Sequence, residues 1–166
     1  MKLKTPLKEE DIKKLKIGDA IEISGKIYVG RDAVLPQIVE VIKNNKLDEY
    51  NLDLKGGVIF HSAVSKAGLG PTSSNKLEIE GTMEDLSLAG IKIHLGKGAL
   101  SGETVKMLNK YNSIFVVIPP ITAYLGDKTI SKKVAAFEKE GMEAFWELEV
   151  KGFPGIVAIA HGETIF

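Results

Sequence analysis

The chain has 166 residues, of which 44% are hydrophobic and 27% charged. This length suits one well-buried domain and is short for two, and the composition is that of an ordinary folded protein without extended disorder. Lysine plus arginine equals aspartate plus glutamate at 22 each, so we do not expect a nucleic acid, which is bound through a basic excess, as a partner.

The sequence contains no cysteine, which excludes disulfides, a thiol nucleophile and thiolate-held zinc or iron–sulfur centres within this chain. The N-terminal residues 1–6 lack the apolar core of a secretory signal, so we expect a cytoplasmic location. The uncharged segment Asn112 to Gly126 is too short to cross a membrane and contains Pro119-Pro120. We predict a buried strand leading into a loop there, and no membrane association.

The N-terminal third is predicted to form a helix, a strand and a second helix. Leu7, Ile12 and Leu15 favour a short amphipathic helix that Thr5 would cap, with Pro6 in its first turn. After a turn at Gly18-Asp19, residues 20–29 alternate apolar and polar side chains around Gly25, as in a strand with a kink or bulge. Residues 33–44 have helical spacing, with Pro36 tolerated in the first turn.

Arg31 lies where this strand passes into the second helix, a position at which loops commonly present functional groups. The alternative is an arginine that is paired with Asp32 or another nearby acid. Both interpretations stay open at this point.

A polar loop follows the predicted strand Val58–Phe60. Residues 70–76 contain glycine, proline, three hydroxyl side chains, asparagine and Lys76. Their N–H, O–H and ammonium groups can converge on a carboxylate or phosphate. The alternative is a solvated surface turn, in which these residue types also cluster.

The central segment alternates further elements. We predict an exposed strand over Lys76–Glu80, a short helix over Met83–Leu88 and a strand over Ile91–Leu95. Lys97 follows that strand between Gly96 and Gly98. The segment is not a P-loop, because Gly98 occupies the Ser/Thr position, but flanking glycines let a backbone approach a ligand closely.

The last third is predicted to contain two helices and three strands. The helices are Ser101–Lys110 and Met142–Trp146, and the strands are Ser113–Ile118, Lys133–Phe137 and Gly155–Ile159. Strands and helices therefore alternate, which favours one compact mixed α/β domain over residues 1–166. The three histidines, His61, His94 and His161, are far apart in sequence, so we do not expect a metal site built from them.

Several segments together resemble the β subunit of class I fumarate hydratase and L(+)-tartrate dehydratase, which is the C-terminal domain of single-chain members. The resemblance runs from about Leu15 to the C-terminus and is most specific in its final block. The segments are Ser24-Gly25-Lys26-Ile27-Tyr28, Arg31-Asp32-Ala33, Gly70-Pro71-Thr72, Gly96-Lys97-Gly98, Gly141 to Val150, and Phe153-Pro154.

The resemblance implies a swivelling β/β/α domain with a mixed sheet, which closes on an iron–sulfur α subunit in a heteromer, α2β2 being one arrangement. The α subunit would hold a [4Fe-4S] cluster, and this chain would bind no cofactor or metal by itself. The implied reaction is reversible hydration in a small hydroxy-dicarboxylate, fumarate/malate or tartrate. Substrate-binding positions fall on Arg31, Ser73, Lys76 and Lys97, and the catalytic position on Thr72.

The sequence departs from the family pattern at several positions. Lys76-Leu77 replaces an arginine-methionine pair, Leu35 replaces a histidine, Pro119-Pro120 begins a changed stretch, and Ser73 replaces a threonine. Lysine keeps the charge of arginine but loses its two-pronged grip on a carboxylate. The alternative to the hydro-lyase subunit is therefore a non-catalytic or altered-specificity paralogue that acts as a binding or structural domain.

Overall fold

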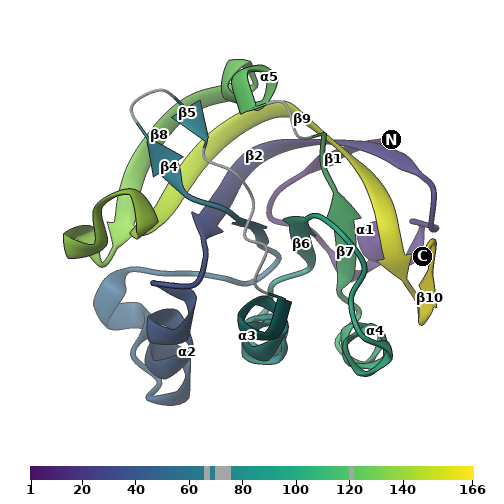
Figure 1. Ribbon diagram of the computed structural model, residues 1–166, viewed down its shortest axis with the longest axis horizontal. Coiled ribbons are helices and arrows are strands. Elements are labelled where there is room, and N and C mark those ends of the chain that lie inside the picture. Colours follow the sequence, from purple (N-terminus) through teal and green to yellow (C-terminus); the bar gives the residue numbers. More distant parts are fainter. Residues whose placement is uncertain (66–67, 70–75, 120–121) are drawn as a thin grey trace.

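The computed structural model describes residues 1–65, 68–69, 76–119 and 122–166 (Figure 1). Within these residues, eight strands form one mixed sheet and two short strands form a second. The main sheet contains β1 (Lys2–Lys4), β2 (Ala20–Gly30), β3 (Val58–His61), β6 (Ile93–Gly96), β7 (Ile114–Val117), β8 (Thr129–Ala136), β9 (Phe145–Ala160) and β10 (Glu163–Thr164), and the small one β4 (Val64–Ser65) and β5 (Gly68–Leu69). The helices are α1 (Glu9–Lys13), α2 (Leu35–Lys43), α3 (Lys76–Leu88), α4 (Gly102–Lys110) and α5 (Thr122–Asp127), with the 3-10 helices η1 (Leu47–Tyr50) and η2 (Glu138–Glu143).

The main sheet closes on itself. Strands β2, β3, β6 and β7 are parallel neighbours, and β9 runs antiparallel to both β7 and β2. The long, curved β9 therefore joins the two ends of the parallel set (Figure 1). The first part of β9 also pairs with β8, on the edge opposite β2. Closure leaves fewer exposed strand edges and encloses an apolar core.

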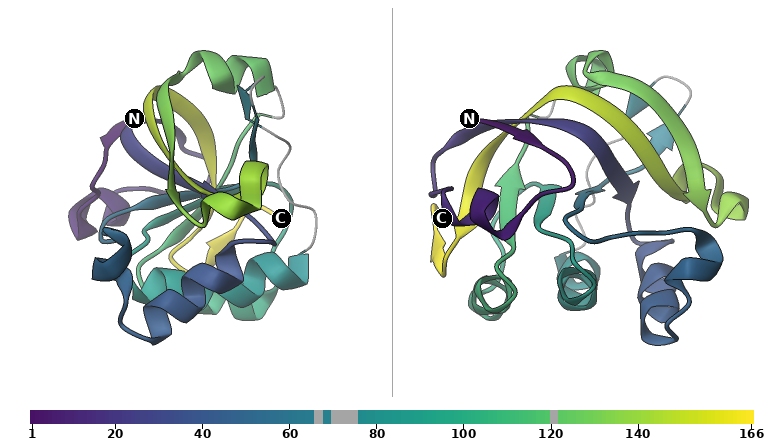
Figure 2. Two further views of the ribbon diagram at one scale, coloured as in Figure 1. Left: turned by 90° about the vertical axis from the view of Figure 1, so that its left-hand side faces the viewer. Right: turned by 180° about the vertical axis from the view of Figure 1, so that it is seen from behind.

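Alternation along the strands divides the buried side chains between two faces. Val58 and Phe60 of β3 face the enclosed core, whereas Ile59 faces a second core shared with α2. Helices α2, α3 and α4 lie side by side in one layer against this outer face (Figure 2). The molecule is a mixed α/β domain with a mixed sheet, as the sequence predicts.

Several predicted elements are confirmed. The pairing of β2 with β9 shifts register between Ile23 and Gly25, which is the predicted bulge. Gly25 has φ +106, and a Cβ there would lie 2.4 Å from Oγ1 of Thr5, so this position requires glycine. Helix α2 has Pro36 in its first turn, and Ser101 caps α4 by accepting a hydrogen bond from the Thr104 N–H.

The predicted strand over Lys76–Glu80 is wrong, because α3 begins at Lys76 and includes the predicted short helix Met83–Leu88. The five-residue alternation fits a helix as well as a strand. Burial follows the helical spacing, since Ile79, Met83 and Leu86 are buried whereas Leu77 is exposed.

The predicted helix over Met142–Trp146 is also wrong. A 3-10 helix ends at Glu143, and Phe145 already belongs to β9, which pairs there with β2 and β8. Phe145 stacks on Tyr28 with ring centroids 5.0 Å apart. Strand pairing on both edges outweighs the local helical preference of this segment.

The N-terminal helix is shorter than predicted, and Thr5 does not cap it. Thr5 donates its backbone N–H to the Ser24 carbonyl, and α1 begins only at Glu9. The side chain of Asp11 instead accepts a hydrogen bond from the Lys8 N–H. The loop predicted after the central buried strand contains α5, and the predicted C-terminal strand is the end of the much longer β9.

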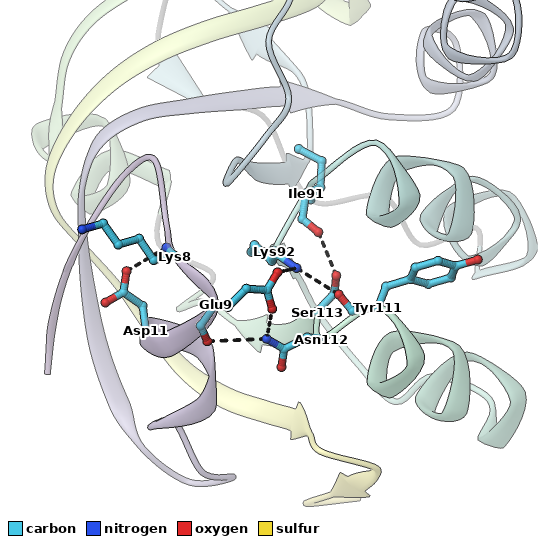
Figure 3. Close-up of polar contacts among 8 residues, drawn as sticks. All are labelled: Lys8, Glu9, Asp11, Ile91, Lys92, Tyr111, Asn112 and Ser113. Carbon is cyan, nitrogen blue, oxygen red and sulfur yellow. Dashed lines mark hydrogen bonds and ion pairs between the residues drawn. The ribbon is translucent and has the colours of Figure 1, made fainter.

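A polar cluster ties α1 to the edge of the sheet where β6 and β7 begin (Figure 3). The Lys92 ammonium lies 2.6 Å from Oε1 of Glu9 and donates to the Tyr111 carbonyl at 3.0 Å. Asn112 donates a hydrogen bond to the same carboxylate. We call this group, Glu9, Lys92, Tyr111 and Asn112, the amino-edge cluster.

Candidate functional site

The carboxyl ends of the four parallel strands form one edge of the sheet. The register pairs Gly30 with His61, and Phe60 with Leu95. Arg31 and Lys97 each come directly after a strand, as the sequence predicts, and parallel pairing brings both to this edge. Strand β3 lies between them, so their backbones are about 10 Å apart, which is two strand spacings.

Arg31 has part of its guanidinium engaged. Its Nε donates to Oε1 of Glu143 at 2.6 Å, and both side chains are half-buried. Its carbonyl accepts the Val34 and Leu35 N–H groups at the start of α2. The alternative of an arginine paired with a nearby acid thus describes this contact, in which the acid is Glu143 of η2.

Lys97 differs from Arg31 in its surroundings. Its side chain is exposed, and it makes no hydrogen bond or ion pair with another described residue. A Cβ on the preceding Gly96 would lie 3.2 Å from the ring of Phe115, and Gly98 has φ +77. The glycines therefore let the turn pass close to Phe115 while leaving the ammonium free to meet an anion.

The start of α3 lies beside the Lys97 loop. Glu80, one turn into α3, accepts the Ser101 N–H at 2.6 Å. Lys76 is the first residue of α3, which brings its backbone to the same edge. Thr72 and Ser73 lie outside the described residues. Helices α2, α3 and α4 all begin at this edge, and their N-terminal N–H groups favour negative charge.

Sequence reasoning missed the pairing of His61 with His94. The two histidines are far apart in sequence, but β3 and β6 are neighbours, and Nε2 of His61 lies 3.1 Å from Nδ1 of His94. Burial lowers the pKa of His61 to about 4, and the nearby Asp32 carboxylate partly opposes this shift. Burial likewise lowers the pKa of His94 well below its usual value, and His61 adds to the effect. Both rings are therefore neutral near neutral pH.

Leu35, one of the positions at which we expect a departure from the family pattern, is buried in the second core. A separate groove of about 630 Å³ is lined by Val117 and Ile118 at the end of β7, but neither Arg31 nor Lys97 lines it.

Among the described residues, no three His, Asp or Glu side chains are placed to hold a metal ion. None of the described helices has the length and apolar character that crossing a membrane requires.

Comparison with known proteins then decides the family. The model of the family described as Fumarase C-terminus matches residues 1–166. The chain belongs to this family. A protein of Methanocaldococcus jannaschii named "Putative L(+)-tartrate dehydratase subunit beta" is 33% identical over 96% of this chain and 88% of the relative. The L(+)-tartrate dehydratase subunit beta of Escherichia coli is 30% identical over 98% and 85%.

A third relative has a different organisation. The "Putative fumarate hydratase class I" of Geobacillus stearothermophilus is 28% identical over 98% of this chain, which covers only 33% of the relative. This Fumarase C-terminus chain thus corresponds to most of a subunit in two of these relatives and to about a third of a longer chain in the other. The resemblance inferred from the sequence is confirmed.

Proposed function

We propose that this chain is the β subunit of a hydro-lyase that reversibly adds or removes water on a small hydroxy-dicarboxylate, fumarate/malate or tartrate. The meeting of Arg31 and Lys97 at the carboxyl edge, beside three helix N-termini, carries the proposal. Cationic side chains and N–H groups at one edge suit a doubly negative substrate. The family and the names of the relatives supply the reaction class.

The residues of this chain do not fit an iron–sulfur cluster. Such clusters are held chiefly by cysteine thiolates, and the sequence has none. We therefore assign the [4Fe-4S] cluster to a partner α subunit, with which this chain would form the complete site. The swivelling motion implied by the family belongs to the same proposal, because it would bring this edge onto the partner.

This chain's part in the chemistry is electrostatic. Loss of a proton from the carbon next to a carboxylate spreads negative charge onto that carboxylate. Lys97 and Arg31, fixed in place before the reaction, would stabilise this charge more than that of the ground state. We assign proton movement, or orientation of the base, to Thr72, and further carboxylate binding to Ser73 and Lys76. A threonine hydroxyl is a poor base at its ordinary pKa, so Thr72 requires cationic neighbours.

The test is to reconstitute the chain anaerobically with the α-type partner and to assay fumarate, malate and tartrate. We expect Lys97→Ala to lower kcat/KM by about 100-fold, as removal of one preset donor does in other enzymes. The matched control is Lys55→Ala, which removes an exposed lysine just before β3, at the opposite edge of the sheet. We expect the control to retain full activity.

Two results would contradict the proposal. Full activity of Lys97→Ala would show that the site lies elsewhere. No turnover of any of the acids by an intact, cluster-loaded complex would favour the alternative, a paralogue that serves as a binding or structural domain or acts on another substrate.

A further inference from the structure

Three polar side chains form a hydrogen-bonded chain on the helix side of β3 and β6. Nε2 of His61 lies 3.1 Å from Nδ1 of His94, and Nε2 of His94 lies 2.9 Å from Oγ of Ser87 in α3. All three are buried, His61 being 1% and His94 0% exposed. Bulk water therefore does not compete for these hydrogen bonds.

The two rings lie edge to edge. Their planes differ by 23°, and their centroids are 5.4 Å apart. The centroids are farther apart than the two nitrogens, whose distance is 3.1 Å. The difference is about the sum of the two ring radii, so the two nitrogens lie on the line between the ring centres. Because ring lone pairs and N–H bonds lie in the ring plane, this geometry suits a hydrogen bond rather than face-to-face stacking.

Two directions of donation satisfy this chain. A neutral imidazole has one N–H donor and one bare nitrogen acceptor. In the first direction Ser87 donates to His94, and His94 donates to His61, which leaves the His61 proton on Nδ1. In the second direction every donor is reversed, and Nδ1 of His61 is a bare acceptor.

The open end of the chain distinguishes the two directions. Nδ1 of His61 is buried and has no hydrogen-bond partner among the described residues. The two nitrogens of an imidazole point in nearly opposite directions, so Nδ1 points away from His94 on β6 and toward β2. Gly30 of β2 pairs with His61, and the negative charge of Asp32, two residues further on, acts on the His61 ring. A bare lone pair facing that charge is less favourable than an N–H.

We propose that the chain runs from Ser87 through His94 to His61, so that a neutral His61 points its Nδ1–H at the Arg31–Asp32 turn. His61 is then a positioning residue for Arg31, because its N–H faces the charge of Asp32 in the turn from which the arginine extends. This Nδ1–H has no hydrogen-bond partner among the described residues, so it acts on the turn through its attraction to the negative charge of Asp32.

The direction is tested by long-range ¹H–¹⁵N spectra of the full chain labelled at histidine, recorded near neutral pH. We expect a protonated, pyrrole-type Nδ1 and a pyridine-type Nε2 in both His61 and His94. His161 is an internal control in which the proton is on the other ring nitrogen. Its Nε2 lies 2.8 Å from the Leu15 carbonyl oxygen, which can only accept a hydrogen bond, so Nε2 must carry the proton. A pyridine-type Nδ1 in His61, or averaged signals, would overturn the proposal.

A variant at the other end tests the role of the serine. Ser87→Ala removes the donor to His94, and we expect both His94 nitrogens to move toward averaged shifts. The control is Thr82→Ala on the same helix, whose buried hydroxyl bonds to the Ile79 carbonyl instead. Unchanged His94 signals in folded Ser87→Ala would contradict the proposed direction. The measurement on the unmodified chain decides the question even if this variant does not fold.

Two replacements of His61 distinguish a residue that positions Arg31 from one that only fills space in the core. In His61→Asn the amide nitrogen can replace the Nδ1 donor, whereas His61→Leu removes it. We expect exchange of the Arg31 Nε–H with solvent to become about 10-fold faster in His61→Leu and to be largely restored in His61→Asn. Equal behaviour of the two variants would show that His61 only fills space.

The kinetic consequence rests on the proposed function. In the reconstituted complex we expect His61→Leu to lower kcat for the dicarboxylate more than it raises KM, because a less fixed Arg31 stabilises the charge that develops in the transition state less well. A complex that never turns over would contradict the proposed function alone. The tautomer and exchange measurements decide the inference in either case.

Discussion

At the level of single residues, the charged groups of Arg31 and Lys97 differ in their surroundings. Arg31 is tied through Nε to Glu143, so its position is set before any ligand arrives. Lys97 is exposed, and no described acid neutralises it. In the function that we propose, the fixed arginine would orient a dicarboxylate and the unneutralised lysine would supply charge.

The buried histidines make the free energy of unfolding depend on pH. The pKa of His61 is about 4 in the folded chain, against an ordinary value of 6.5. Between these values the unfolded chain binds a proton that the folded chain does not, so stability falls as the pH is lowered. From pH ~7 to ~5 we expect His61 to account for a loss of about 2 kcal/mol. Denaturant midpoints at the two pH values measure it.

The control for this prediction is a double variant, His61→Leu with His94→Leu. Replacing both rings removes both titrating groups together with their mutual hydrogen bond, and leaves the Ser87 hydroxyl without its His94 partner at either pH. We expect the double variant to lose much less stability over the same pH range. The same pH dependence in both proteins would mean that other groups cause it.

At the level of elements, the sequence predicts those segments in which local preference and tertiary pairing agree. The first turn of α2 with Pro36 and the Ser101 cap of α4 are local signals, and both are confirmed. Lys76–Glu80 and Met142–Trp146 are short and ambiguous. In the first segment the helical spacing of Ile79, Met83 and Leu86 over about two turns decides. In the second segment the pairing of β9 with strands on both edges decides.

The amino-edge cluster supports a prediction about α1. Lys92 is 9% exposed, and its ammonium lies against the more exposed Glu9 carboxylate. The hydrogen bond from Lys92 lowers the pKa of Glu9, with Asn112 adding to the effect. Glu9→Gln leaves a largely buried cation without its counter-charge, and we expect a loss of about 1 kcal/mol in the free energy of unfolding. Denaturation at low salt measures it.

Glu10→Gln is the matched control for this prediction. Glu10 is exposed, lies in the same first turn of α1 and makes no ion pair with a described residue. Both variants remove one negative charge near the helix N-terminus, so their difference isolates the contact with Lys92. If both lost equal stability, the ion pair itself would contribute nothing.

At the level of the whole molecule, the candidate site could be predicted only in part. Arg31 and Lys97 are each recognisable as residues that follow a strand, and parallel pairing then brings them to one edge. The contact between His61 and His94 could not be predicted, because it depends on β3 lying beside β6 in a particular register. The ion pair of Arg31 with Glu143 links residues 112 positions apart and depends on closure of the sheet by β9.

Closure of the sheet leads to the last prediction, at the place where β9 lies between β7 and β2. Gly155 is buried there and pairs with Ile21 of β2. A Cβ at Gly155 would lie 2.3 Å from Cγ1 of Val116, a fully buried and stiff side chain of β7. We expect Gly155→Ala to lower the free energy of unfolding by about 2 kcal/mol, because the two strands must move apart. Guanidinium denaturation measures the change.

The same substitution in α3 is expected to have the opposite sign. A Cβ added at Gly81 would meet nothing within 4 Å, and this residue is exposed in the helix. Alanine is the better helix former, so Gly81→Ala should raise the free energy of unfolding by up to about 1 kcal/mol. Comparing the two variants separates the general effect of replacing glycine from the steric effect at the closure. If Gly155→Ala were as stable as Gly81→Ala, the contact between β7 and β9 could not be what holds the closed sheet in register.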